Sequence, residues 1–512
     1  MKNGLVAFTA IFMVLSAAGG ASADDLSSLK QTTAALKKQN DALLRRLEQL
    51  EKRQSAQQSA PSQRPEPESF IAQASKEPLS VVTGDGPITW RGITLFGVVD
   101  AGLAWQSHGA PFNGYYPQGL EYAIAKNSNH AAFNIAPGAM GYSGIGLKGE
   151  EELLPGLAGV FGVNTQFNTG SGQLANGPAS LVQNNGVALA HQSSNGDSAR
   201  AGQAFNDYAY IGLSSRDFGQ LTVGRQRTLT TDDRSIYDPL AGSLAFSLLG
   251  YTGSLSSGDT ENSRLDNALK YQVHVGPARF AAIYKLGAPG SGASPTNGQT
   301  YQVSAGFDYR ALSFDAVYSH VSNAITLTSL TAAQVTVEPA NSLAGTISDN
   351  SAVLLSAKYT INQFKFFGGY EYIRYSDPKD PIVAPYVDGN GYLVSVTNNN
   401  AFQYHDKILQ VIWTGVKYAY DSHLDLSLGY YHEFQNSYGK INCNYAYNNK
   451  IVTNASTCSG AEDAVGAVAE YHFNKRFEIY GGLMYSVVTN GMANGFLYAN
   501  TIDPTIGARY AF

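Results

Sequence analysis

Apolar and polar residues alternate one by one through a long series of segments that starts at Ile93 and continues to Phe512. One segment interleaves the apolar set Tyr301, Val303, Ala305, Phe307 and Tyr309 with the polar set Gln302, Ser304, Gly306, Asp308 and Arg310. Residues 312–319 and 424–430 repeat the pattern. Alternation kept up for about ten residues is typical of a strand that faces lipid on one side and water on the other.

We count sixteen strands of this kind and predict that they start near residues 93, 141, 157, 204, 219, 263, 277, 299, 311, 350, 363, 404, 423, 462, 476 and 502. Short turns at 276–277, 420–423 and 474–476 alternate along the chain with long loops such as 106–140 and 323–349. Transmembrane barrels need both kinds of connection, whereas a soluble β-sandwich would not need apolar outer residues on every strand. The sequence therefore predicts an all-β fold over residues 90–512, a transmembrane antiparallel β-barrel of about 16 strands.

The composition agrees with such a barrel. Charged residues make up 14% of the chain, against about 25% in ordinary soluble proteins. Glycine (53) and tyrosine (32) are abundant. The mean hydropathy of −0.17 is on the polar side, which excludes a bundle of apolar membrane helices.

Residues 1–23 have the pattern of a signal peptide: Lys2 is the basic region, residues 5–15 are the apolar core, and residues 21–23 match a cleavage site. The alternative is a membrane anchor, but the apolar core is shorter than the ~20 residues that a spanning helix needs. Cleavage removes Lys2 and no acidic residue, so the net charge changes from −6 to −7. A negative chain disfavours nucleic acid as a partner, because phosphate binding requires a basic patch.

Residues 24–54 are predicted to form a short periplasmic coiled coil, with a solvated amphipathic helix as the alternative. The 3-4 spacing of a heptad repeat runs through Leu26, Leu29, Thr33, Leu36, Asn40, Leu43, Leu47 and Leu50. Every d position is Leu, and the a positions hold Leu, Thr, Asn and Leu. Residues 55–89 follow as a linker rich in Pro, Gln and Ser.

The two cysteines, Cys443 and Cys458, are predicted to form a loop disulfide in an oxidising compartment. Free thiols or half of a metal site are the alternatives, but no histidine lies between the two cysteines. The nine histidines are scattered, and the sequence has no nucleophile elbow, phosphate loop or dinucleotide-binding glycine pattern. We therefore predict no catalytic residues, no enzyme activity, no cofactor and no metal site.

Four segments make residues 90–512 resemble the general, trimeric, 16-stranded porins of the Gram-negative outer membrane. They are ITLFGVVDAG at 93–102, SGIGLKGEEEL at 143–153, YIGL at 210–213 with FGQLTVGRQ at 218–226, and the terminal YAF at 510–512. The resemblance implies a homotrimer and a terminal aromatic signal for the barrel-assembly machinery, here Tyr510 and Phe512. The N-terminal coiled coil is a departure from the plainest members and looks like the periplasmic extension of some substrate-specific porins.

The resemblance also implies that the third loop, about 228–262, folds into the barrel and narrows it. In the family, a basic cluster on the wall faces acidic residues on this loop. By this resemblance, the residues expected to form the constriction are Arg225, Arg227, Arg264, Asp232, Asp233 and Asp238. Strict alternation would turn Arg225 toward lipid, so a bulge near Gly224 or a subunit-interface position is needed. Each acidic residue has an ordinary solvated loop carboxylate as its alternative.

Lys148, Lys270 and Arg509, like Arg264, have inward parity and are predicted as basic residues that face the lumen. The leading functional hypothesis is passive diffusion of small hydrophilic solutes and ions through a water-filled pore in the outer membrane. A pore selective for sugars or anions is the alternative within transport. An outer-membrane enzyme and a surface receptor or adhesin are less favoured. Expected partners are outer-membrane lipid and, through the coiled coil, the peptidoglycan.

Overall fold

A computed structural model describes the chain at residues 37, 38, 45, 88–109, 130–174, 179–188, 204–250, 263–286, 299–387, 392–440, 443, 447–448, 451–452 and 455–512. The chain divides into two units, residues 1–69 and 70–512. The predicted signal peptide lies outside the described residues, as do the linker up to residue 87 and all but three residues of the coiled coil. The second half of the predicted constriction loop, 251–262, lies outside them too.

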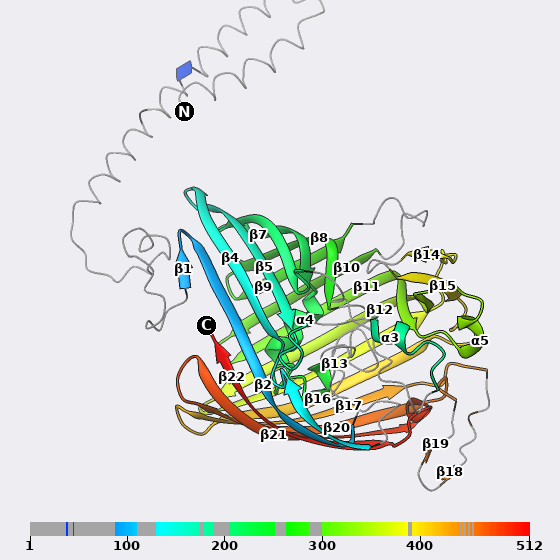
Figure 1. The fold of residues 1–512 in the computed structure, drawn as a ribbon. Helices are drawn as coiled ribbons and strands as arrows, with labels where there is room; N and C mark the ends of the chain where they lie inside the picture. Colours follow the sequence, from blue (N-terminus) through cyan, green and yellow to red (C-terminus); the bar gives the residue numbers. More distant parts are fainter. Residues whose placement is uncertain are drawn as a thin grey trace, which may run out of the picture. The chain divides into compact units, whose positions relative to one another are not determined.

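The described part of the second unit is a closed antiparallel barrel of 16 strands (Figure 1). In chain order the strands are β2 (Ile93–Gly109), β3 (His130–Pro137) with β4 (Ser143–Leu154), β5 (Leu157–Phe167), β6 (Tyr208–Ser215), β7 (Gly219–Arg227), β8 (Arg264–Val275), β9 (Ala278–Lys285), β10 (Thr300–Tyr309), β11 (Leu312–Thr328), β12 (Ser342–Ile361), β13 (Phe364–Ser376), β16 (Lys407–Ala419), β17 (Leu424–Gln435), β20 (Gly460–His472), β21 (Phe477–Asn490) and β22 (Asn500–Ala511). Each pairs with the next, and β22 pairs with β2 to close the ring.

The smaller elements lie at the ends of the barrel or inside it. They are β1 (Ile88–Trp90), α3 (Ala179–Gln183), α4 (Leu229–Tyr237), the 3-10 turns Leu248–Gly250 and Gly491–Ala493, α5 (Ala332–Val335), β14 (Tyr386–Val387), β15 (Leu393–Asn398), β18 (Tyr447–Asn448) and β19 (Ile451–Val452). Among the described residues, no helix is both long enough and apolar enough to cross a bilayer.

The alternation predicted from the sequence is confirmed by the side-chain positions. On β10, Tyr301 and Val303 are 38% and 47% exposed on the outer face, whereas Gln302 between them is fully buried inside. Two-residue turns at 276–277, 310–311 and 362–363 join strands at one end of the barrel. Gly276, Arg310 and Asn362 have positive φ values of 59°, 55° and 51°, as tight hairpin turns require.

The strand starts predicted from the sequence agree with the structure to within four residues, with two exceptions. The second strand begins with β3 at His130 instead of near 141, inside the predicted long loop 106–140. β12 begins at Ser342 instead of near 350. The predicted long loop 323–349 is largely strand, because β11 and β12 continue to pair as far as Thr328 and Ala344. A register shift between Val321 and Ala324 separates this outer hairpin from the regular pairing below it. Bulges of this kind break the strict period of two, which is why the sequence pattern ended at residue 322.

Candidate pore constriction

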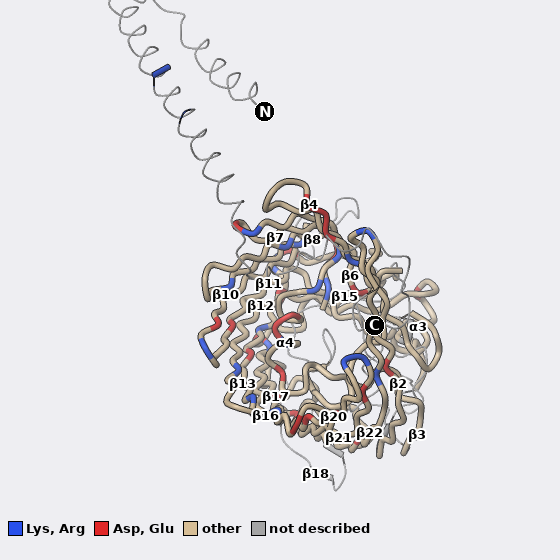
Figure 2. Tube along the Cα trace, turned by 90° about the vertical axis from the view of Figure 1, so that its left-hand side faces the viewer, with Lys and Arg blue, Asp and Glu red and all other residues tan. Residues whose placement is uncertain are grey.

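The segment that follows β7 turns into the barrel instead of leaving it. Thr228 caps α4, since its side-chain oxygen accepts a hydrogen bond from the backbone N–H of Thr231. The helix ends at Tyr237, and Pro239 follows at a position where a helix cannot continue. Figure 2 shows α4 lying within the ring of strands, with acidic residues on it. The predicted inward fold of the third loop is therefore present over residues 228–250.

Hydrogen bonds attach α4 to the inner wall on several strands. The side-chain oxygen of Gln302 on β10 accepts from the backbone N–H of Leu229 at 2.6 Å. The indole N–H of Trp413 on β16 donates to the carbonyl of Tyr237 at 3.1 Å. Ser356 on β12 donates to a carboxylate oxygen of Asp233 at 2.6 Å. These three strands lie close together in the sheet, so the bonds fix the helix against one side of the inner wall.

Beyond the helix, residues 239–249 pack as an apolar plug against β16, β17, β20 and β21. The members of this core on the loop are Leu240, Leu244, Ala245, Phe246, Leu248 and Leu249. Glycines on the wall make room for the plug: Gly415 and Gly429, which pair in the sheet, face Pro239, and Gly466 faces the backbone of Phe246. A Cβ at Gly466 would collide with the carbonyl oxygen of Phe246.

A buried arginine–carboxylate cluster holds the start of the loop to β8. Asp207 is fully buried and accepts from Arg227 at 2.5 Å and from Arg264 at 2.6 Å. The amide of Asn164 donates to the same carboxylate at 2.7 Å. Arg264 is 4% exposed, whereas the Arg227 side chain is 39% exposed. Of the two guanidinium groups, the one that solutes can reach is Arg227.

Arg225 is buried among protein groups. Its Nη2 donates to the carbonyl of Asn206 at 2.7 Å, and its Nη1 contacts Asp266 at 2.6 Å. The pairing of β7 with β8 shifts register between Gly224 and Gln226, so the bulge that inward placement of Arg225 requires is present. The side chain is 9% exposed, which makes it a structural brace beside the constriction.

The three acidic candidates on the loop occupy different environments. Asp232 is 36% exposed and contacts the Nζ atom of Lys270 on β8 at 2.5 Å. Asp233 is 3% exposed and bonded to Ser356. Asp238 is 2% exposed and accepts from the hydroxyl of Tyr431 at 2.6 Å. Asp232 is thus the carboxylate among them that a solute can meet.

The remaining predicted residues lie away from the loop. Lys148 projects inward over the ring of Phe96, with its Nζ 5.9 Å from the ring centre. Arg509 pairs with Glu478 at 3.0 Å near the end of the barrel that carries the short turns. Phe512 exchanges two backbone hydrogen bonds with Gly97, at 2.9 and 3.0 Å. These bonds complete the closure between the last strand and the first.

Tyr510, on β22, is 43% exposed on the outer face. Cys443 and Cys458 form a disulfide with a Cα–Cα distance of 5.7 Å. Sequence reasoning did not identify Asp207, Gln302 or the glycines that face the plug. A polar residue directly before a strand, such as Asp207, carries no signal of its own, because its role depends on which strands become neighbours.

The electrostatics differ between the two buried carboxylates near the lumen. Burial alone would raise the pKa of Asp207, which precedes β6, but the guanidinium groups of Arg264 and Arg227 outweigh burial and hold the pKa well below its usual value. For Asp233 in α4, the guanidinium of Arg279 lowers the pKa less than burial raises it. Burial, with the charge of Asp315 adding to it, raises the pKa of Asp233 to about 7.

This geometry can be compared with known proteins. The family model for Gram-negative porins matches residues 69–491, which is most of the chain and nearly all of the barrel. The chain belongs to this family. Family membership and the closed barrel place the porin in the outer membrane.

An outer membrane porin protein of Bordetella pertussis is 27% identical to the porin over 181 residues, which is 35% of the chain and 39% of the relative. The match therefore spans less than half of that relative. The anion-selective porin from Comamonas acidovorans has a similar fold, with a TM-score of 0.52, 15% identity and coverage of 82% of this chain and 99% of that chain. The outer membrane protein OmpT of Vibrio cholerae aligns with a TM-score of 0.49 and 13% identity, covering 83% of this chain and 100% of that one.

Proposed function

We propose that this porin forms a water-filled pore for passive diffusion of small hydrophilic solutes and ions across the outer membrane. The observation that carries the proposal is the inward segment 228–250, which crosses a polar-lined barrel and is bonded to opposite parts of its wall. Such a segment narrows the lumen and limits the size of the solutes that can pass. Family membership favours a pore over an enzyme.

Among the predicted constriction residues that the structure describes, the exposed charged groups are Arg227 and Asp232, and Asp232 is in contact with Lys270. Charges in a narrow opening with a low-dielectric rim act strongly on ions and polar solutes. In this porin the Nζ atom of Lys270 on the wall lies 2.5 Å from a carboxylate oxygen of Asp232 on the loop. The electric fields of these two opposite charges therefore largely cancel. Arg227 and Arg264 share the single carboxylate of Asp207, so these three groups keep a net charge of +1, and Arg227 is their exposed member. We therefore assign Arg227 the main electrostatic influence on ions at the base of the loop.

A preference for anions is the second candidate within transport. The base of the loop holds the cations Arg225, Arg227, Arg264 and Lys270 against the carboxylates Asp207, Asp232 and Asp266, which leaves a net charge of +1. Because Arg227 is the one accessible guanidinium in this set, we expect weak anion selectivity and no row of anion-binding sites along the pore. The preference is expected to weaken at high salt, because exposed charges are screened within about 8–10 Å.

Single-channel recording in planar bilayers tests the proposal. We expect large, ohmic conductance steps, a reversal potential in a salt gradient that indicates weak anion preference, and no block by sugars. Arg227→Gln should shift the reversal potential toward cations, whereas Arg310→Gln, at a turn between two strands, should not. Block by a sugar or anion at low concentration would establish the substrate-selective alternative. Absence of any conductance would refute the pore.

We also propose that the porin is a homotrimer embedded in outer-membrane lipid and inserted by the barrel-assembly machinery through Tyr510 and Phe512. An outward groove of about 640 Å³ supports a subunit contact. Small and apolar side chains line the groove, among them Leu103, Ala469, Gly481, Ile506 and Ala508. Within the same proposal, residues 1–23 are a cleaved signal peptide, and residues 24–54 reinforce the trimer or contact the peptidoglycan.

A further inference from the structure

A network of charged side chains lines the inner wall at the end of the barrel that carries the short turns 420–423 and 473–476. Its members come from the ends of β16, β17, β20, β21 and β22. They are Lys417, Asp425, Glu470, His472, Glu478 and Arg509, with side chains between 10% and 37% exposed. The network is separate from the constriction residues described above.

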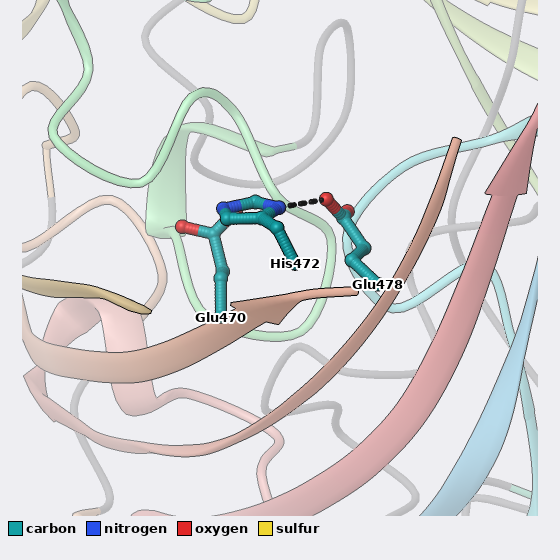
Figure 3. Close-up of side chains that lie close together, drawn as sticks. All are labelled: Glu470, His472 and Glu478. Atoms are coloured by element: carbon teal, nitrogen blue, oxygen red, sulfur yellow. Dashed lines mark ion pairs between the residues drawn. The ribbon is translucent and has the colours of Figure 1, made fainter. Parts of the chain in front are cut away.

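Strand register brings the members of this network together. Asp425 lies opposite Glu470 in the β17–β20 pairing, and His472 lies opposite Glu478 in the β20–β21 pairing. Glu470 and His472 are two positions apart on one strand, so both face the lumen. Figure 3 shows the imidazole of His472 between the carboxylates of Glu470 and Glu478.

Three side chains of the network lie close enough together to offer ligand atoms to one metal ion. Glu470, His472 and Glu478 each offer a ligand atom, and these atoms all lie within 4.8 Å of one another. Nδ1 of His472 is 2.9 Å from a carboxylate oxygen of Glu478, and Nε2 is 3.4 Å from Asp425. Tetrahedral Zn²⁺ with bonds of about 2.0–2.2 Å separates its ligands by roughly 3.4 Å. Small side-chain rotations are enough to reach that separation.

The network has a net negative charge that a bound cation would compensate. Asp425, Glu470 and Glu478 carry three negative charges, and Lys417 and Arg509 carry two positive charges, so the network has a net charge of −1 when His472 is neutral. An uncompensated carboxylate beside an imidazole at a low-dielectric wall is stabilised by a bound cation. The combination of imidazole with carboxylates suits Zn²⁺ better than Mg²⁺, which prefers oxygen ligands alone.

We propose that Glu470, His472 and Glu478 bind a divalent transition-metal cation of the Zn²⁺ type at this mouth of the barrel. The ammonium group of Lys417 lies 3.0 Å from both Asp425 and Glu470, and it competes with the metal for the Glu470 carboxylate. Binding changes the net charge of the mouth from −1 to +1. Zn²⁺ therefore acts as a regulator of ion passage from the side of the membrane that this mouth faces.

Direct binding tests the proposal on the full-length porin purified in detergent, with ZnCl2 titrated by calorimetry and MgCl2 as the comparison metal. We expect saturable binding of Zn²⁺ and none of Mg²⁺. His472→Gln should weaken binding by more than about 10-fold, since loss of even an outer-shell partner costs that much. His423→Gln is the matched control, because His423 lies in the turn 420–423 at the same end and belongs to no ligand set. Heat-modifiable gel mobility verifies that each variant is folded.

Lys417→Met separates a built site from unspecific association. The site predicts tighter Zn²⁺ binding when the competing ammonium is removed, and loss of this gain when His472→Gln is combined with Lys417→Met. Unspecific carboxylate binding predicts the same gain with and without His472. Equal affinity in wild type and His472→Gln, or unchanged affinity in Lys417→Met, would overturn the proposal. These measurements do not depend on conduction. In bilayers, where the readout rests on the proposed pore, Zn²⁺ added to one side should lower cation conductance in wild type and not in His472→Gln.

Discussion

The hydroxyl of Tyr480 on β21 donates a 2.5 Å hydrogen bond to the carboxylate of Asp100 on β2. The bond passes over β22 at Gly507, where a Cβ would meet the hydroxyl. The other carboxylate oxygen of Asp100 accepts from the backbone N–H groups of Met140 and Gly141, at the break between β3 and β4. One carboxylate thus connects the first, second and fifteenth strands inside the barrel.

Tyr480→Phe should destabilise the barrel by about 1–3 kcal/mol, because a buried carboxylate loses a donor that water cannot replace. The ring packs edge-on against Phe246 of the plug, with centroids 6.1 Å apart, and this contact remains. Urea unfolding followed by tryptophan fluorescence measures the change. Tyr485→Phe, on the outer face of the same strand, is the control and should have no effect. Equal stability of both variants would show that the Asp100 bond is not important.

Asp207→Asn should cost roughly 3–5 kcal/mol, the usual effect of breaking a buried ion pair. The pKa of Asp207 is lower in the folded state than in the unfolded state, and this difference sets the sign of the pH dependence of stability. The carboxylate stabilises the porin above the unfolded pKa of about 3.9, and this stabilisation is lost as pH falls toward the lowered folded pKa. The gap in melting temperature between wild type and the variant should therefore be constant from pH 8 to 5 and narrow below pH 4. A constant gap down to pH 2 would contradict the ion-pair explanation.

Asp233 should make conduction pH-dependent near neutrality, since burial raises its pKa to about 7. It faces Ser356 and Lys358 on β12, Asp315 on β11 and Arg279 on β9. The folded state binds more protons than the unfolded state between about pH 4 and 7, so stability should fall as pH rises through this window. Acidification from pH 8 to 6 should also shift the reversal potential toward anions, because a negative charge is lost from the loop.

Asp233→Asn is the decisive variant for this pH effect, because it keeps the hydrogen bond to Ser356 and cannot ionise. Its reversal potential and stability should be nearly flat between pH 6 and 8. Asp232→Asn is the comparison, since Asp232 lies on the same helix and pairs with Lys270. If the pH dependence of Asp233→Asn matches that of wild type, another group is responsible.

Gly466→Val should displace the plug and increase single-channel conductance, because a Cβ at this position collides with the backbone of Phe246. Overpacking of this kind costs typically about 1–3 kcal/mol. Ala467→Val, at the next position and on the opposite face of β20, is the control. Unchanged conductance in a folded Gly466→Val variant would show that residues 239–249 do not set the pore size.

Much of the fold was predictable because it depends on a local property. The alternation of apolar and polar residues identifies each strand within about ten residues, and Gly and Pro mark turns such as 276–277. The disulfide between Cys443 and Cys458 could also be predicted from the sequence, since the chain has no other cysteine. The hairpin 323–349 was missed as strand because a bulge interrupts its period.

The candidate site was predictable only in part. Resemblance and parity named Arg227, Arg264, Asp232 and Lys270, but they did not indicate which charged groups pair with one another. Asp207 becomes the centre of the arginine cluster because β5, β6, β7 and β8 pair in order. Asp238 became a buried acceptor of Tyr431, 193 residues along the chain.

The amino-acid sequence by itself determined that this chain alternates between a lipid-facing and a water-facing surface in sixteen strands, because alternation is a period of two along the backbone. Only the tertiary structure decided which carboxylate meets which guanidinium, how the plug fits against Gly415 and Gly466, and that His472 lies between two glutamates. These contacts depend on the register between strands and on barrel closure. The physical reason is that side chains far apart in the chain meet only after the sheet has closed.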